Sequence, residues 1–256
     1  MKNLMDLTGR HIVVTGAGQG IGLCAATLLA ELGANLTLVE IADEGAELLR
    51  TRFPDAFVAQ GSVTDRDFVQ KTVEDGAARF DGLDGLLNNA GIIRTAMIEK
   101  MTIEQWQAVI DVNLTGVFNC LQAVGTQMIA ESKTRQDNRQ RAIVNIASDA
   151  GRRGSIGQIN YAAAKSGVLG MTMTAAKEWG RYGIRTNSVC FGVVETEMTE
   201  VIRSDKFRDK YLSAVPMGAF LSPEQAVQSI AFLLSSASDF ISGQHLSVNG
   251  GSHMGF

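Results

Sequence analysis

The chain has 256 residues, of which 45% are hydrophobic and 20% charged, and its formal net charge at pH 7 is −4. This balance is typical of a soluble globular protein and excludes a disordered one, while the negative charge gives no basic field for nucleic acid or an anionic membrane. The three cysteines, Cys24, Cys120 and Cys190, lie far apart in apolar stretches, which predicts buried thiols and no disulfide framework.

The chain shows no internal boundary. Proline occurs three times, and no Ser/Gly-rich or charged block divides the sequence, so a single domain over residues 1–256 is predicted. No long apolar run follows a basic segment at the start, and no stretch approaches the ~20 continuous apolar residues of a membrane span. The expectation is a cytoplasmic protein.

Strand and helix patterns alternate along the chain. In order, the patterns predict a strand at 11–15, helix 21–32, strand 35–40, helix 43–52, strand 56–60, helix 66–80, strand 85–89, helix 103–129, strand 142–148, helix 159–181, strand 185–191 and strand 245–248. The strand runs are almost continuously apolar, as expected of a parallel sheet with helices on both faces. The predicted fold is a doubly wound α/β sheet of about seven strands, with its ligand beyond their carboxyl ends.

A glycine-rich turn joins the first predicted strand to the first helix. Its sequence from Thr15 is Thr-Gly-Ala-Gly-Gln-Gly-Ile-Gly. Such glycines let the backbone approach a pyrophosphate, and the amino end of the helix offers free N–H groups to the anion. The cofactor-binding residues predicted here are Gly16, Gln19, Gly20, Ile21 and Gly22.

Glu40 ends the second predicted strand, about 20 residues after the turn. An acid at this spacing can accept hydrogen bonds from the ribose 2′-OH of NAD. No Arg or Lys neighbours it in sequence, so a 2′-phosphate would be repelled, which favours NAD over NADP. After the fourth strand, Asn88-Asn89-Ala90-Gly91 places small and amide side chains at the same edge, and Asn89, Ala90 and Gly91 are expected to contact the cofactor.

Segment 131–141 is polar and has no apolar period. It is predicted to be an exposed loop. Arg152 and Arg153 follow soon after Ser148 and could meet an anionic group on a substrate, although solvated loop side chains are the simpler interpretation.

Three residues form the predicted chemical group. Tyr161 and Lys165 lie four apart in an alanine-rich helical stretch and therefore share one face. An ammonium beside a phenol lowers the phenol's pKa, so that Tyr161 can exchange a proton near neutral pH. Ser148 closes a strand and can donate to a carbonyl oxygen. The spacing of His11, His245 and His253 does not match a metal site, and neither a nucleophile elbow nor a phosphate loop occurs.

Taken together, these motifs resemble the short-chain dehydrogenase/reductase family. The matching features run in the family's order over nearly the whole chain: Thr15-Gly16-x-x-x-Gly20-x-Gly22, Asn88 to Gly91, Asn113, Ser148, Tyr161-x-x-x-Lys165, and Gly192 to Thr196.

The resemblance implies a Rossmann-type fold, a homotetramer and a small-molecule carbonyl or alcohol substrate. Tyr161 would be the general acid/base, Ser148 would hold the substrate oxygen, and Lys165 would bind the nicotinamide ribose. Asn113 would place a water in a proton relay, and Val194 and Thr196 would bind near the carboxamide.

Two positions depart from the family. Phe191 stands where Pro is usual, and Ser62 replaces an Asp that commonly touches the adenine, leaving Val63 to contact the ring through its backbone.

The substrate is open at this stage. Specificity is expected from residues 92–98, 149–160 and a substrate lid at 195–214. The pattern is most like the 3-oxoacyl reductase branch, which commonly uses NADPH, so Glu40 also favours a polyol or hydroxysteroid-type alcohol dehydrogenase. A dinucleotide sensor without catalysis is the third hypothesis.

Overall fold

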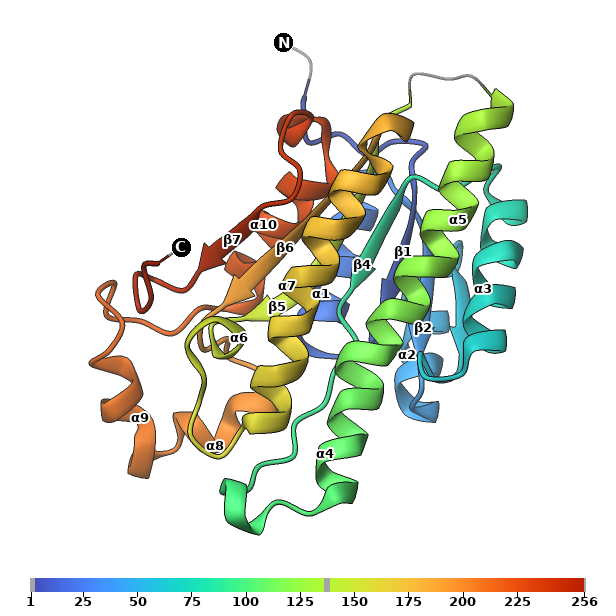
Figure 1. Ribbon diagram of the computed structural model, residues 1–256. Coiled ribbons are helices and arrows are strands. Elements are labelled where there is room, and N and C mark those ends of the chain that lie inside the picture. Colours follow the sequence, from blue (N-terminus) through green and yellow to red (C-terminus); the bar gives the residue numbers. More distant parts are fainter. Residues whose placement is uncertain (1–2, 136–138, 256) are drawn as a thin grey trace.

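A computed structural model describes residues 3–135 and 139–255 of the chain. Its centre is a parallel sheet of seven strands in the order β3-β2-β1-β4-β5-β6-β7 (Figure 1). The strands are β1 (His11–Thr15), β2 (Asn35–Glu40), β3 (Phe57–Gln60), β4 (Gly85–Asn88), β5 (Arg141–Ser148), β6 (Ile184–Phe191) and β7 (His245–Val248). The doubly wound sheet is confirmed, and the strand order reverses between β1 and β4, where such folds bind ligands.

Helices cover both faces of this sheet, as Figure 1 shows. The main helices are α1 (Gly20–Glu31), α2 (Asp43–Arg52), α3 (Arg66–Arg79), α4 (Ile103–Ile110), α5 (Val117–Arg135), α7 (Ile159–Trp179) and α10 (Pro223–Leu234). Side chains alternate across each strand, so Ile12 and Val14 pack into one apolar cluster and Val13 into the other. Strand β1 therefore contributes to two cores, one on each face of the sheet.

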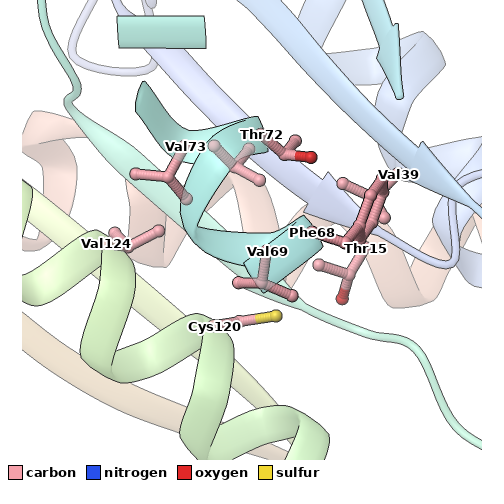
Figure 2. Close-up of a pocket in the computed structure, with 9 residues that line it drawn as sticks. Thr15, Val39, Phe68, Val69, Thr72, Val73, Cys120 and Val124 are labelled. Atoms are coloured by element: carbon pink, nitrogen blue, oxygen red, sulfur yellow. The ribbon is translucent and has the colours of Figure 1, made fainter. Parts of the chain in front are cut away.

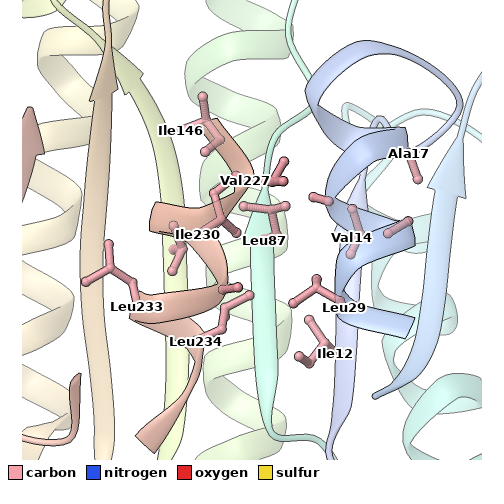
Figure 3. Packing of buried hydrophobic residues seen from close by; sticks show 14 of the residues in the cluster. Ile12, Val14, Ala17, Leu29, Leu87, Ile146, Val227, Ile230, Leu233 and Leu234 are labelled. Atoms are coloured by element: carbon pink, nitrogen blue, oxygen red, sulfur yellow. The ribbon is translucent and has the colours of Figure 1, made fainter. Parts of the chain in front are cut away.

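The first core joins β1 and β5 to α1 and α10. Leu29 from α1 and Ile230 from α10 are both fully buried against Val14 and Ile146 of the strands (Figure 3). This packing places the amino end of α1 directly after β1, where the glycine-rich turn runs.

The second core lies under α3 and α5. A small apolar cavity remains between these helices and β1 and β2, and Val69, Cys120 and Val124 line it (Figure 2). Burial raises the pKa of the Cys120 thiol to about 12, so this sulfur stays protonated and inert, as expected of a buried structural cysteine.

The helix predicted at 103–129 is interrupted. Its backbone forms a π-helical turn at Asp111–Gly116 between α4 and α5, and π-turns inside helices are frequent at functional sites. The combined run Ile103–Arg135 is long and apolar enough to cross a bilayer, but 56% of its most apolar window is buried inside the protein, as in a core helix.

The prediction of an exposed loop at 131–141 is wrong at both ends. Residues 131–135 continue α5, and Arg141 begins β5 with a fully buried side chain. The Glu131 carboxylate accepts from the backbone N–H of Leu83 at 3.0 Å and lies 3.8 Å from Arg141. Pairing with each other allows these charged groups to be buried. Residues 136–138 of the predicted loop lie outside the described residues.

Candidate active site

The glycine-rich turn forms a tight cradle after β1. Gly16 and Gly20 have φ of +63° and +51°, a region that L side chains rarely adopt. A Cβ on Gly22 would lie 1.9 Å from the carbonyl oxygen of Gly16, so only glycine fits. Among the described residues, no side chain caps the amino end of α1, which leaves its N–H groups available to a phosphate. The turn therefore fits a dinucleotide pyrophosphate.

The segment after β4 is fastened to this turn. The Asn89 side-chain amide donates to the carbonyls of Thr15 and Gly16, each at 3.0 Å. In return, the Thr15 hydroxyl accepts from the backbone N–H groups of Asn89 and Ala90 at 3.0 and 3.1 Å. A Cβ on Gly16 would lie 2.9 Å from the Ala90 Cα. The structure thus brings residues 15–22 and 88–91 together, as the sequence predicted.

Glu40 lies beside the turn at the end of β2. One carboxylate oxygen accepts from the Gly18 N–H at 2.8 Å, and the other accepts from Ile41 and Ala42 at 2.9 and 3.1 Å. These three partners in the described structure are all backbone groups, and Glu40 is 8% exposed. A largely buried carboxylate therefore borders the cradle.

The predicted adenine contacts lie at the end of β3. The Ser62 hydroxyl is hydrogen-bonded to Thr64 at 2.8 Å. The carbonyl of Val63 accepts from the Asn119 side chain of α5 at 3.0 Å. These bonds hold the segment at the same sheet edge as Glu40. The Val63 carbonyl already accepts a hydrogen bond from Asn119.

Tyr161 and Lys165 share one face of α7, one turn apart. The Lys165 ammonium lies 5.6 Å from the centre of the Tyr161 ring and donates to the carbonyl of Ile146 at 2.7 Å. Lys165 is 2% exposed, and this burial lowers its pKa to about 8. The pair predicted from the spacing is present, with the ammonium anchored on β5.

Ser148 ends β5 and faces Tyr161. Its hydroxyl accepts from the Ala150 N–H at 3.1 Å and lies near enough to the Tyr161 phenol to lower the pKa of that group. The hydroxyl, phenol and ammonium predicted from sequence therefore come together at the carboxyl edge of the sheet.

The predicted lowering of the Tyr161 pKa does not appear in this structure. Burial raises the pKa of the phenol above its ordinary value, and the hydrogen bond from Ser148 lowers it by less. Desolvation disfavours the charged phenolate, and the Lys165 ammonium that would stabilise it is directed to Ile146.

Asn113 sits in the π-helical turn with a fully buried side chain. Its carbonyl oxygen accepts from the Ile92 N–H at 2.8 Å, and its amide donates to the Ile92 carbonyl at 2.9 Å. The side chain therefore fixes the backbone just after Gly91.

Val194 and Thr196 follow β6 at the same edge. Val194 pairs with Leu221 in an isolated bridge, and the Thr196 methyl lies 3.4 Å from where a Cβ on Gly20 would be. Phe191 is 4% exposed and pairs with Ser148 and Val248 in the sheet. In place of the proline usual there, it extends β6 without a break.

Asn160, directly before Tyr161, is a residue that sequence reasoning did not single out. Its buried amide donates to the carbonyls of Arg94 and Gln105, each at 3.0 Å, and its oxygen accepts from the Tyr161 N–H at 2.8 Å. It joins the loop after β4, helix α4 and the start of α7. Asn160 is the second residue of α7, and nothing in the sequence distinguished it from other polar residues at the start of a helix.

Arg152 was interpreted as solvated, and this is wrong. It lies in the short helix α6 (Ala150–Arg153), is half-buried, and donates to the Ser247 hydroxyl at 2.6 Å and the Gly255 carbonyl at 2.7 Å. Its neighbour Arg153 is exposed.

The expected lid lies beyond the carboxyl ends of the strands, where Figure 1 labels α8 and α9. Its short helices are a 3₁₀ turn at Glu197–Thr199, α8 (Glu200–Arg203) and α9 (Asp205–Leu212), and none of their described residues is buried. Few buried contacts are typical of a segment that can move.

Comparisons with known proteins agree with this geometry. A sequence model of the family described as enoyl-(acyl carrier protein) reductase matches residues 16–253. The chain is 41% identical over 253 residues to the 3-oxoacyl-(acyl-carrier-protein) reductase FabG of Thermotoga maritima, covering 96% of this chain and 99% of the relative. It is 37% identical over 250 residues to FabG of Staphylococcus aureus, covering 96% and 98%.

Solved structures are also similar. A short-chain type dehydrogenase/reductase from Mycobacterium marinum superposes with a TM-score of 0.89 at 27% identity, covering 97% of both chains. Levodione reductase superposes with a TM-score of 0.87 at 33% identity, covering 96% of this chain and 98% of that one.

Proposed function

Because the chain belongs to the short-chain dehydrogenase/reductase family, we propose that it reduces the keto group of a 3-oxoacyl thioester. Membership makes it an oxidoreductase that moves a hydride between a nicotinamide cofactor and an alcohol or carbonyl carbon. The thioester substrate is supported by the names of the FabG relatives, which match the chain over 96% of its length.

The meeting of Ser148, Tyr161 and Lys165 at the carboxyl edge of the sheet is the observation that carries the chemistry. Tyr161 donates its hydroxyl proton to the substrate oxygen as the carbonyl is reduced. Ser148 donates a hydrogen bond to the same oxygen and holds it beside the phenol. The raised pKa of Tyr161 keeps this acid protonated at neutral pH.

A bound nicotinamide dinucleotide would supply the hydride. The cradle of Gly16, Gln19, Gly20, Ile21 and Gly22 would hold its pyrophosphate, and Val63 and residues 89–91 would border its adenosine. Val194 and Thr196 would lie by the carboxamide. Lys165 would bind the nicotinamide ribose, and moving its ammonium from Ile146 towards that ribose would bring positive charge nearer the phenol.

We assign NAD(H) as the preferred dinucleotide. The support is Glu40, whose largely buried carboxylate accepts from Gly18 at the cradle. A 2′-phosphate there would meet this negative charge, whereas a ribose hydroxyl can donate to it.

Glu40 also supports a second candidate, a secondary-alcohol dehydrogenase of the polyol or hydroxysteroid type. The similarity to levodione reductase, at 33% identity, points the same way. The experiment that separates the two is a substrate panel of 3-oxoacyl thioesters, cyclic ketones, polyols and hydroxysteroids, each assayed with both dinucleotides. Fastest turnover of a 3-oxoacyl thioester supports the proposal. Faster turnover of another class refutes it, and dinucleotide binding without turnover of any compound would indicate a sensor.

A homotetramer is proposed because large apolar side chains are exposed in two parts of the chain. Phe118 of α5 and Met173 of α7 are 42% and 45% exposed, and Phe240 and Leu246, the latter in the edge strand β7, are 105% and 37% exposed. Light scattering coupled to size exclusion measures the assembly, and a monomer at micromolar concentration would contradict it.

A further inference from the structure

A buried carboxylate ties the turn after Ser148 to the carboxyl end of the chain. Asp149 is 3% exposed, and its two oxygens accept from the side-chain amide of Asn249 at 3.0 and 2.9 Å. The Ser252 hydroxyl donates to the same carboxylate at 3.1 Å. Three donor contacts satisfy a carboxylate that would otherwise be costly to bury.

The Asn249 side chain in turn hydrogen-bonds to the backbone of segment 249–253. Its side-chain oxygen accepts from the Gly251 N–H at 3.0 Å, and its amide also donates to the His253 carbonyl at 2.9 Å. The Cα of Asn249 lies 3.1 Å from the position of a Cβ on Gly192. The Asp149–Asn249 pair therefore reaches the segment that leads to Val194 as well.

The same segment supports the residues that follow the lid. The Gly250 carbonyl accepts from the Met217 N–H at 3.1 Å, and a Cβ on Gly250 would lie 2.7 Å from a Val215 methyl. A Cβ on Gly251 would lie 3.1 Å from the Pro216 ring. Val215 is buried, in contrast to α8 and α9 before it. Residues 215–217 thus anchor the carboxyl end of the lid on the turn held by Asp149.

We propose that Asp149 is a positioning residue. Through Asn249 it fixes the residues that anchor the carboxyl end of the lid relative to Ser148. The closed lid then has a defined position relative to the hydroxyl that holds the substrate oxygen. This inference rests on the proposed roles of Ser148 and the lid. Asp149 touches no reacting atom and acts only by placing the elements that do. Arg152, bonded to Ser247 and Gly255, fastens the same two parts of the chain at a second point.

The test exchanges donor and acceptor across the pair. Asp149→Asn keeps the shape and one acceptor oxygen but turns the other into an amide donor, so the contacts that the second oxygen accepts are lost, and Asn249→Asp opposes two carboxylates. We expect each single variant to raise KM for the carbonyl substrate about ten-fold, as for a lost buried hydrogen bond, with kcat within about three-fold of the unmodified protein. The double variant restores one amide–carboxylate pair but not the bond to His253, so its KM should recover in part.

A second measurement needs no turnover. The lid carries the trypsin sites Arg203, Lys206, Arg208 and Lys210. Loosening its anchor should increase the open population, and cleavage within 195–214 should accelerate about ten-fold in the single variants and less in the double variant. Asp239→Asn removes an exposed carboxylate elsewhere and should leave both KM and cleavage unchanged.

Ser252→Ala removes one bond to the same carboxylate and provides a milder test if Asp149→Asn does not fold. It should raise KM and speed cleavage by a smaller factor. Unchanged KM and cleavage in the folded variants would overturn the proposal. So would a loss of kcat and thermal stability that the exchanged pair does not recover, because that pattern indicates a merely structural role. If no compound is turned over, the proposed function fails, while trypsin still reports whether Asp149 holds the lid.

Discussion

The carboxylate of Glu40 accepts a hydrogen bond from the backbone N–H of Gly18 across 2.8 Å. This bond joins the end of β2 to the glycine-rich turn and puts a negative charge at the edge of the dinucleotide cradle. A Cβ on Gly18 would lie 2.7 Å from the same carboxylate oxygen, so the close approach depends on glycine.

Cofactor preference should follow from this charge. We expect a higher kcat/KM with NADH than with NADPH, and Glu40→Gln should reduce that ratio about ten-fold by removing the repulsion of the 2′-phosphate. Steady-state rates with both dinucleotides measure it. Glu44→Gln, an exposed change in α2, should leave the ratio as it is. Equal efficiencies in the unmodified protein would refute the assignment of Glu40.

Tyr161→Phe should remove the proton donor and retain the fold. We expect turnover to fall by a factor of about 10²–10⁴, while dinucleotide binding, followed by fluorescence titration, persists. Tyr182→Phe serves as the matched control, because Tyr182 lies beyond the far end of α7. Near-normal turnover of Tyr161→Phe would show that another group transfers the proton.

Lys165 should make stability depend on pH in the alkaline range. Burial lowers its pKa from 10.5 to about 8, so between these values the unfolded chain binds the proton and the folded protein does not. The contribution of Lys165 to the free energy of unfolding therefore rises with pH across this window. The Lys165→Met variant has no such titrating group. At pH 7 its free energy of unfolding should exceed that of the unmodified protein, and this difference should shrink between pH 8 and 10.

Urea unfolding of both proteins measures this difference. The raised pKa of Cys120, about 12, acts in the opposite direction but is common to both proteins, because its cause is burial alone. A stability difference that stays constant from pH 7 to 10 would mean that Lys165 titrates with its ordinary pKa.

Asn160→Leu should loosen the start of α7 and the loop after β4. It leaves the carbonyls of Arg94 and Gln105 and the N–H of Tyr161 without their partner, and we expect a loss of about 2–4 kcal/mol in the free energy of unfolding. Chemical denaturation measures it. Asn35→Leu, at an exposed position, should change stability by less than about 0.5 kcal/mol. A similar loss of free energy of unfolding in Asn160→Leu and Asn35→Leu would refute the structural role of Asn160.

Two glycine-to-alanine changes should differ in their effect, one on dinucleotide binding and the other on stability. Gly22→Ala places a methyl 1.9 Å from the Gly16 carbonyl oxygen and should abolish dinucleotide binding, as titration would show. Gly170→Ala, in α7 with open space around it, should stabilise the protein by about 0.5–1 kcal/mol. Retained dinucleotide affinity in Gly22→Ala would show that the cradle is not where the dinucleotide binds.

Much of the fold could be predicted from local pattern alone. Strands β1, β2 and β7 and helix α2 have the bounds expected from the sequence, because apolar period and turn residues are local properties. The placing of Ser148 at the carboxyl edge followed from the same rule, since every parallel strand ends there, whereas the meeting of Tyr161 and Lys165 with it was implied by the family resemblance.

Long-range partners could not be predicted in this way. The π-turn at Asn113 accompanies its bonds to Ile92, 21 residues away, and Arg141 is buried because Glu131 is near it. The rise in the Tyr161 pKa depends on how deeply the phenol is buried and on the direction of the Lys165 ammonium.

The sequence by itself thus determined the order of elements, the parallel sheet and the edge at which the chemical groups meet, because these depend on periodicity over a few residues. Tertiary structure decided which polar groups pair in the interior, such as Asp149 with Asn249 across 100 positions. That choice depends on packing between distant segments, where a buried polar group must find its partner.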